Sequence, residues 1–315
     1  MASWKGKTRG GLLGYKIFVF ILKNLGLRAA YLLLVFVSFY FVLFAPTSTK
    51  AIYSFFRKRL KKGRLPSAWA VYRTYFSFGQ ALIDRTAVLA GQNHKFTYYF
   101  DGIEHLQTIA EEGNGGVLIS CHGGNWSMAG SMLEDSVGNH ARVNIVMLEA
   151  EHQKIKAFLD RIQVKQAANI IGIGDDFSHI IKMGTALRNG EILCMHGDRF
   201  LPGAETVVVD FFGEKAHLPA GPFQLITRMK VPYTIVFAFK ETVSHYHFYS
   251  TPPFRDSTSV QDAAQYFATS VEEKIRLYPY QWYNFYDFWA VPDTPTQTSS
   301  RRKRNNTKKK QASNG

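Results

Sequence analysis

A histidine directly follows a short apolar segment that leads into small residues. The stretch GVLISCHGGNWSMAG, residues 116–130, has the pattern of a buried strand, then His122, Gly123 and Gly124, then the apparent start of a helix. An imidazole can accept a proton near neutral pH. The two glycines let the backbone approach a substrate closely, and their N–H groups could stabilise an oxyanion. We expect Asn125 and Trp126 to cap and pack the start of the helix and so to shape the site.

The surrounding pattern places this histidine at the edge of a sheet. From Asp101 onward, short apolar runs alternate with helical stretches, which is typical of an α/β fold with a largely parallel central sheet flanked by helices. In such sheets ligands bind at the carboxyl ends of the strands, where His122 would lie. The expected strands are Gly116–Cys121, Asn144–Leu148, Ile192–Met195, Val207–Phe211 and Tyr233–Phe239. The expected helices are Met128–Leu133, Gln153–Ile162, Asp176–Asn189, Gly221–Met229 and Val260–Tyr278.

The net charge of +14 is concentrated at the two ends of the chain. Residues 1–83 carry 14 Lys and Arg and no acid, and residues 301–315 carry seven more, which leaves 17 basic and 24 acidic residues between them. A central body with an acidic excess is the opposite of what a domain that grips nucleic-acid phosphates needs. We therefore expect no nucleic-acid partner, and we interpret the basic ends as contacts with an anionic membrane surface.

An uncharged segment of 17 residues, Ala29–Ala45, lies between basic flanks. As a helix it would reach about 26 Å, which spans a bilayer only marginally. Because both flanks are basic, the positive-inside bias selects no direction of crossing. We favour a helix that lies in the cytoplasmic leaflet over a true crossing, and a buried core helix is the third possibility.

Composition divides the chain into three parts. Residues 1–83 form a basic and apolar membrane-associating helical region, residues 84–293 form the α/β core, and the polar tail 294–315 is expected to be disordered. Two cysteines imply no disulfide framework and fit a reducing compartment.

Other residues near His122 invite different chemistry. Cys121 could be a thiol nucleophile, but neighbouring strand residues face opposite sides, which favours a small core residue. Ser127 lacks the Gly-x-Ser-x-Gly turn of a hydrolase nucleophile. His196 and Asp198, taken with His122, show no recognised ligand spacing, so we predict no metal and no other cofactor.

Three blocks of sequence resemble one protein family. The HGGNW at residues 122–126 is similar to the His-x-x-Asn-Trp-Glu of the bacterial lipid A biosynthesis acyltransferases, which are members of the lysophospholipid acyltransferase superfamily. GEILCMHGDRF, residues 190–200, resembles the family's strand that ends in Asp-Gln, which places Asp198 on the family's acidic position and Arg199 on its Gln. VDFFGEKAHLPAGPFQLITRMKVPY, residues 209–233, resembles its Phe-Phe-Gly segment. Arg161 would match a site arginine, and WKGKTRGGLLGY at residues 4–15 resembles the family's basic, glycine-rich start.

The resemblance implies a reaction and a place in the cell. The family's histidine deprotonates an acceptor hydroxyl or amine, which attacks an acyl thioester on acyl carrier protein. We therefore expect an enzyme on the cytoplasmic face of the cell inner membrane that acylates a lipid or glycolipid. In this interpretation His122 is the base, Arg161 and Arg199 contact anions, and Gly123, Gly124 and Asn125 adjoin the substrate.

This sequence departs from the family at one position of the motif. Ser127 stands where the family has a glutamate that orients the histidine. A hydroxyl can fix the ring tautomer but supplies little charge compensation. Asp198 could compensate, Ser127 could suffice for a slow enzyme, or the protein could be a catalytically silent lipid-binding paralogue. A membrane hydrolase that uses Ser127 is a further alternative.

Overall fold

The computed structural model describes residues 18–126 apart from 19 and 23, and residues 128, 141–148, 169–174, 176, 178–255 and 259–291. Several segments singled out from the sequence lie outside these residues. They are the opening at 4–15, Ser127, nearly all of the helix expected at Met128–Leu133, the helix expected at Gln153–Ile162 with Arg161, and the tail 294–315.

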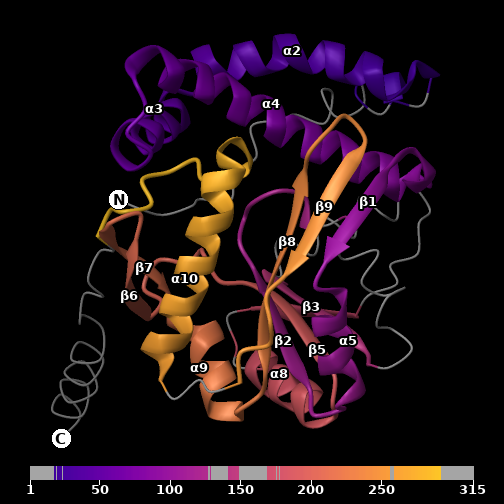
Figure 1. Cartoon of the computed structure of the whole chain (residues 1–315), viewed down its shortest axis with the longest axis vertical. Helices are drawn as coiled ribbons and strands as arrows, with labels where there is room; N and C mark the ends of the chain where they lie inside the picture. Colours follow the sequence, from indigo (N-terminus) through magenta and orange to yellow (C-terminus); the bar gives the residue numbers. More distant parts are fainter. Residues whose placement is uncertain are drawn as a thin grey trace, which may run out of the picture.

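A seven-stranded sheet forms the centre of the molecule (Figure 1). Its strand order is β1-β9-β8-β2-β5-β3-β4, and β8, β2, β5, β3 and β4 run parallel to one another. β9 is antiparallel to β8 and parallel to the edge strand β1. The predicted α/β class with a largely parallel sheet is confirmed. The strands are β1 Thr97–Asp101, β2 Gly116–Ser120, β3 Val143–Leu148, β4 Asn169–Ile173, β5 Ile192–His196, β8 Tyr233–Lys240 and β9 His245–Ser250.

Helices and one hairpin surround the sheet. The helices are α5 Ile103–Glu111, α8 Ser178–Arg188, α9 Ala220–Met229 and α10 Val260–Leu277. The segment expected as the strand Val207–Phe211 is β6, Thr206–Phe211, which pairs with β7, Glu214–Pro219, in a two-stranded hairpin separate from the central sheet. At the start of α10 the Ser259 hydroxyl accepts a hydrogen bond from the Asp262 N–H at 3.0 Å, a typical helix cap.

Helices from the N-terminal region form a layer along one end of the sheet (Figure 1). They are α2 Gly26–Phe44, α3 Pro46–Ser54 and α4 Arg64–Leu89, with a π-helical turn at Phe55–Arg59 between the last two. Within the described part of the chain, α2 alone is long and apolar enough to cross a membrane, and only 22% of its apolar window is buried. The domain boundary expected after residue 83 falls inside α4, and the three-part division stays a prediction.

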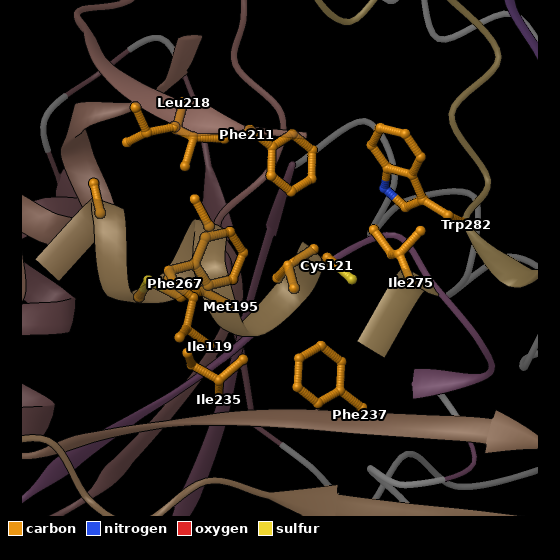
Figure 2. Close-up of a cluster of buried hydrophobic side chains, with 14 of the residues drawn as sticks. Ile119, Cys121, Met195, Phe211, Leu218, Ile235, Phe237, Phe267, Ile275 and Trp282 are labelled. Carbon is orange, nitrogen blue, oxygen red and sulfur yellow. The ribbon is translucent and has the colours of Figure 1, made fainter. Parts of the chain in front are cut away.

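The core covers both faces of β2, all five of whose residues are buried. On one face, Val117 and Ile119 belong to a cluster with residues of α9 and α10, and Figure 2 shows Ile119 and Cys121 within it. On the other face Leu118 packs with residues of α5. Cys121 is fully buried, and this burial raises the pKa of its thiol, so it is a core residue and not a partner of His122.

Candidate active site

The register of two neighbouring strands brings His122 and Asp198 together. β2 and β5 pair in parallel with Ser120 opposite His196, so the residues two positions beyond each strand meet at the same edge of the sheet. The N–H of Gly197 donates to the carbonyl of Ser120 at 2.9 Å and holds the two strand ends side by side.

His122 and Asp198 form a doubly hydrogen-bonded pair. The Nδ1 of His122 lies 2.7 Å from Oδ1 of Asp198, and the backbone N–H of His122 donates to Oδ2 at 2.8 Å. Burial would raise the pKa of the Asp198 carboxyl, but the adjoining charges of His122 and Arg199 hold it well below its usual range. An ionised carboxylate only accepts hydrogen bonds, so Nδ1 carries a proton, and Nε2 is the ring nitrogen that can act as the base when it is unprotonated.

Exposure differs sharply within this pair. The Asp198 side chain is 4% exposed and the His122 side chain is 24% exposed. The carboxylate is thus shielded from water, while the imidazole reaches the surface of the site. A buried carboxylate behind a partly accessible imidazole is the arrangement that stabilises an imidazolium during proton transfer.

A second imidazole lies against the first. The ring of His196 is 4.3 Å from the ring of His122, and it makes an edge-to-face contact with the ring of Trp126 at 4.8 Å. Burial, with the charge of His122, lowers the pKa of His196 to about 3. Its Nδ1 finds no hydrogen-bond partner among the described residues. His196 therefore stays neutral, and its ring packs against the ring of His122.

Among the described residues, the side chains of His122, His196 and Asp198 form a group that could hold a metal ion. One ligand atom each from His122, His196 and Asp198 lies within 4.8 Å of the others. Both oxygens of Asp198 already accept hydrogen bonds from His122. An ion held by the Asp198 carboxylate would compete with these two hydrogen bonds, whereas the pair as it stands is the arrangement of a base and its orienting carboxylate.

The two glycines after His122 are engaged inside the protein. The N–H of Gly123 donates to the carbonyl of Cys121 at 2.8 Å, and the N–H of Gly124 donates to the carbonyl of Gln281 at 2.8 Å. Neither donor is available for an oxyanion in this geometry, which corrects that part of the sequence interpretation. Gly124 has φ +63°, and a Cβ there would lie 2.0 Å from the carbonyl oxygen of Ala238. It is the close approach of the loop to β8 that requires this glycine.

Asn125 and Arg199 also hold the loop. The Asn125 side chain is buried and donates to the carbonyl of Ala81 on α4 at 3.1 Å and to the Tyr246 hydroxyl at 3.3 Å. A guanidinium nitrogen of Arg199 donates to the carbonyl of Tyr283 at 2.7 Å. The N–H of Tyr283 in turn donates to the carbonyl of His122 at 2.9 Å. Both residues therefore position the loop that carries the histidine.

Comparison with known proteins adds the family. The model of the bacterial lipid A biosynthesis acyltransferases matches residues 70–290. The chain belongs to this family. The match includes β2, β5 and the loop between residues 121 and 126, so the His122–Asp198 pair lies inside the matched part of the chain.

Curated relatives share a narrower name. A phosphatidylinositol mannoside acyltransferase of Mycobacterium tuberculosis is 26% identical over 209 residues, which cover 64% of this chain and 63% of that protein. A protein of the same name from Mycolicibacterium smegmatis is 30% identical over 127 residues, 39% of this chain and 40% of its own length. The chain thus spans less than two thirds of the length of the curated relatives it matches.

Two acyltransferase-type site residues predicted from the sequence, Ser127 and Arg161, lie outside the described residues. Asp198, predicted as the alternative carboxylate, is in contact with His122. Sequence reasoning missed Trp282 and Tyr283, whose backbones pair with Gly123 and His122. No local signal marks them, because they act through main-chain atoms and lie about 160 residues away along the chain.

Proposed function

We propose that this protein is a membrane-associated acyltransferase that moves a fatty acyl chain from a thioester to the hydroxyl or amine of a lipid or glycolipid. The observation that carries the proposal is the buried Asp198 carboxylate hydrogen-bonded to Nδ1 of the accessible His122. This pair supplies a base whose second nitrogen takes no hydrogen bond from the described residues, and a charge that stabilises the imidazolium.

The reaction follows from that pair. Nε2 of His122 takes the proton of the acceptor group as the acceptor oxygen or nitrogen attacks the thioester carbonyl. The tetrahedral intermediate collapses, the carbon–sulfur bond breaks, and the thiolate leaves with the proton that His122 returns. Asp198 stays ionised throughout and holds the imidazolium in place. In this account Asp198 performs the orienting task that the family assigns to the position of Ser127, and Arg161 and Arg199 contact the anionic groups of the substrates.

The donor that we propose is acyl carrier protein, and the acceptor is a glycolipid or related lipid. The family match supports an acyl thioester donor, and the names of the mycobacterial relatives support an acceptor with a sugar headgroup. Asp84 is the first acidic residue of the sequence. The basic segment before it would attract an anionic partner or an anionic membrane surface.

The proposed location is the cytoplasmic leaflet of the cell inner membrane. The outer face of α2 exposes large apolar side chains, each more than half accessible, namely Leu32, Phe36, Phe39, Tyr40, Leu43 and Phe44. Exposed basic residues follow from the end of α3 to the start of α4, namely Arg57, Lys58, Lys61, Lys62 and Arg64. An apolar face beside a cationic segment is the composition of a helix that lies in the interface of an anionic bilayer.

An assay with labelled acyl carrier protein separates this proposal from its rivals. The purified protein is incubated with carrier protein bearing a radiolabelled acyl chain and with a total bacterial lipid extract, and a parallel sample receives the acyl coenzyme A thioester. Labelled lipid supports the transferase. Labelled free fatty acid alone would favour a hydrolase that uses Ser127, and no turnover from either donor would favour the silent lipid-binding paralogue.

A further inference from the structure

A buried charged cluster joins the N-terminal helices to the sheet. Asp84 of α4 is fully buried, and its Oδ2 lies 2.6 Å from Nζ of Lys240 at the end of β8. The hydroxyl of Tyr31 from α2 and the hydroxyl of Tyr246 from β9 both donate to the same carboxylate. Four elements therefore meet at one side chain.

The cluster continues to the loop that carries His122. The Nδ2 of Asn125, three residues after His122, donates to the Tyr246 hydroxyl at 3.3 Å, and that hydroxyl donates to Asp84. The backbone N–H of Asn125 donates to the carbonyl of Ala238 on β8 at 2.7 Å. Asn125 is thus held by its side chain and its main chain, and Tyr246 is the link to the charge.

The energetics favour a positioning task for this cluster. Burial raises the pKa of Asp84 and lowers the pKa of Lys240. Removal from water therefore disfavours the charged form of each group, although the charge of each partner favours the charged form of the other. A buried ion pair is often no more stabilising than apolar side chains of the same volume, but its hydrogen bonds fix directions that apolar packing leaves loose. In this cluster the hydrogen bonds run from Asp84 through the Tyr246 hydroxyl to the Asn125 side chain, whose orientation they fix.

We propose that Asp84 and Tyr246 are positioning residues that hold His122 in line with Asp198 through Asn125. This inference rests on the proposed acyltransfer. Tyr246 accepts from Asn125 and donates to Asp84, so it ties the loop after His122 to the contact between α4 and the sheet. Tyr31 donates to the same carboxylate from α2, and its other side-chain contacts include Phe76, Val243 and Lys240. Among the described residues it makes no hydrogen bond to the loop after His122, so it anchors the helix and not the loop.

The two tyrosines form a matched pair for a test. Tyr246→Phe and Tyr31→Phe each remove one hydroxyl that donates to Asp84, and each keeps its ring. Tyr246→Phe should lower kcat by about tenfold to a hundredfold with KM changed less than about threefold, because a small misplacement of the base costs rate and not binding. Tyr31→Phe should keep kcat within about twofold.

Hydrogen exchange tests the same inference without turnover. In peptides that cover residues 118–126, the amides of Gly124 and Asn125 are protected by bonds to other segments. Tyr246→Phe should speed their exchange, and Tyr31→Phe should leave it unchanged. Equal effects of the two variants on kcat and on exchange would overturn the inference, as would a Tyr246→Phe variant that matches the wild type in both. A wild type that transfers no acyl chain defeats the proposed function, whereas the exchange comparison still decides the inference.

Discussion

The carboxylate of Asp198 accepts both a side-chain and a backbone hydrogen bond from His122, at 2.7 Å and 2.8 Å. The backbone hydrogen bond fixes the position of the His122 main chain, and the side-chain hydrogen bond fixes the orientation of its ring. Two bonds between the same residues leave the imidazole little freedom, so the orientation of the ring is set before a substrate binds.

Asp198→Asn should leave the fold intact and reduce kcat by about 10²- to 10⁴-fold, because the amide supplies no charge to the imidazolium and can hold the wrong ring tautomer. Acyl transfer kinetics and a thermal melt check this. Asp210→Asn is the matched control, since Asp210 is an exposed carboxylate paired with Lys215 in the β6–β7 hairpin. A loss of activity in that control equal to the loss in Asp198→Asn would contradict the assignment.

Lowering the pH should destabilise the fold through His196. An unfolded histidine titrates near 6.5, and burial lowers the pKa of His196 to about 3 in the folded chain. Between these values only the unfolded chain binds the proton, so stability falls as the pH decreases, by up to about 1.4 kcal/mol per pH unit from this group. Urea unfolding at a series of pH values measures the slope. His196→Phe should make the slope shallower between about pH 6 and 4, and an unchanged slope would show that His196 is protonated in the folded protein.

Gly124→Ala should disrupt the loop far more than the same change at another glycine with positive φ. At Gly124 a Cβ would lie 2.0 Å from the carbonyl oxygen of Ala238, whereas at Gly213, with φ +77°, nothing lies within 4 Å. Gly213→Ala should cost only the backbone strain, about 1–2 kcal/mol. Gly124→Ala should cost more than that and reduce activity as well, as measured by denaturant unfolding and acyl transfer. Equal losses of stability in the two variants would indicate that the loop can move away from β8.

The exposed face of α2 should carry the protein to the membrane. Replacing Phe36 and Leu43, which are 66% and 70% exposed, by serine removes apolar area worth about 1.5–3 kcal/mol each if it is buried in lipid. Sedimentation with vesicles that contain anionic lipid should then show at least about tenfold weaker binding. Ile181→Ser on α8 removes a similarly exposed side chain from the opposite end of the molecule (Figure 1) and should bind as the wild type does. Equal vesicle binding by the wild type, the α2 variant and Ile181→Ser would show that the exposed face of α2 does not bind the membrane.

Much of the fold could be predicted from the sequence where apolar runs were continuous. The segments around Val117, Ile192 and Ile235 are buried on both faces, so their strands and their parallel class were visible. β1, β4 and β9 were not predicted. Tyr98, Tyr99 and His245 give β1 and β9 a polar and aromatic composition without a clear apolar run, and β4 is a five-residue strand, NIIGI, that begins with Asn169. β7 was missed for a similar reason, since Glu214 and Lys215 begin it.

The candidate site was predictable in part for a different reason. His122 and Asp198 each follow a recognisable strand, and parallel pairing brings such positions to one edge. The hydrogen-bond acceptors of the Gly123 and Gly124 N–H groups were not predictable, because they include the carbonyl of Gln281, which lies far along the chain. The charged cluster at Asp84 was hidden as well, since its four members come from four elements.

The rate of acyl transfer by His122→Ala, measured with labelled acyl carrier protein and vesicles of total lipid, tests the central claim most directly. The account predicts that this variant folds and binds vesicles as the wild type does but forms labelled lipid at least about a thousandfold more slowly, because the base and its charge partner act as one unit. Formation of labelled lipid by His122→Ala at a rate close to that of the wild type would contradict it.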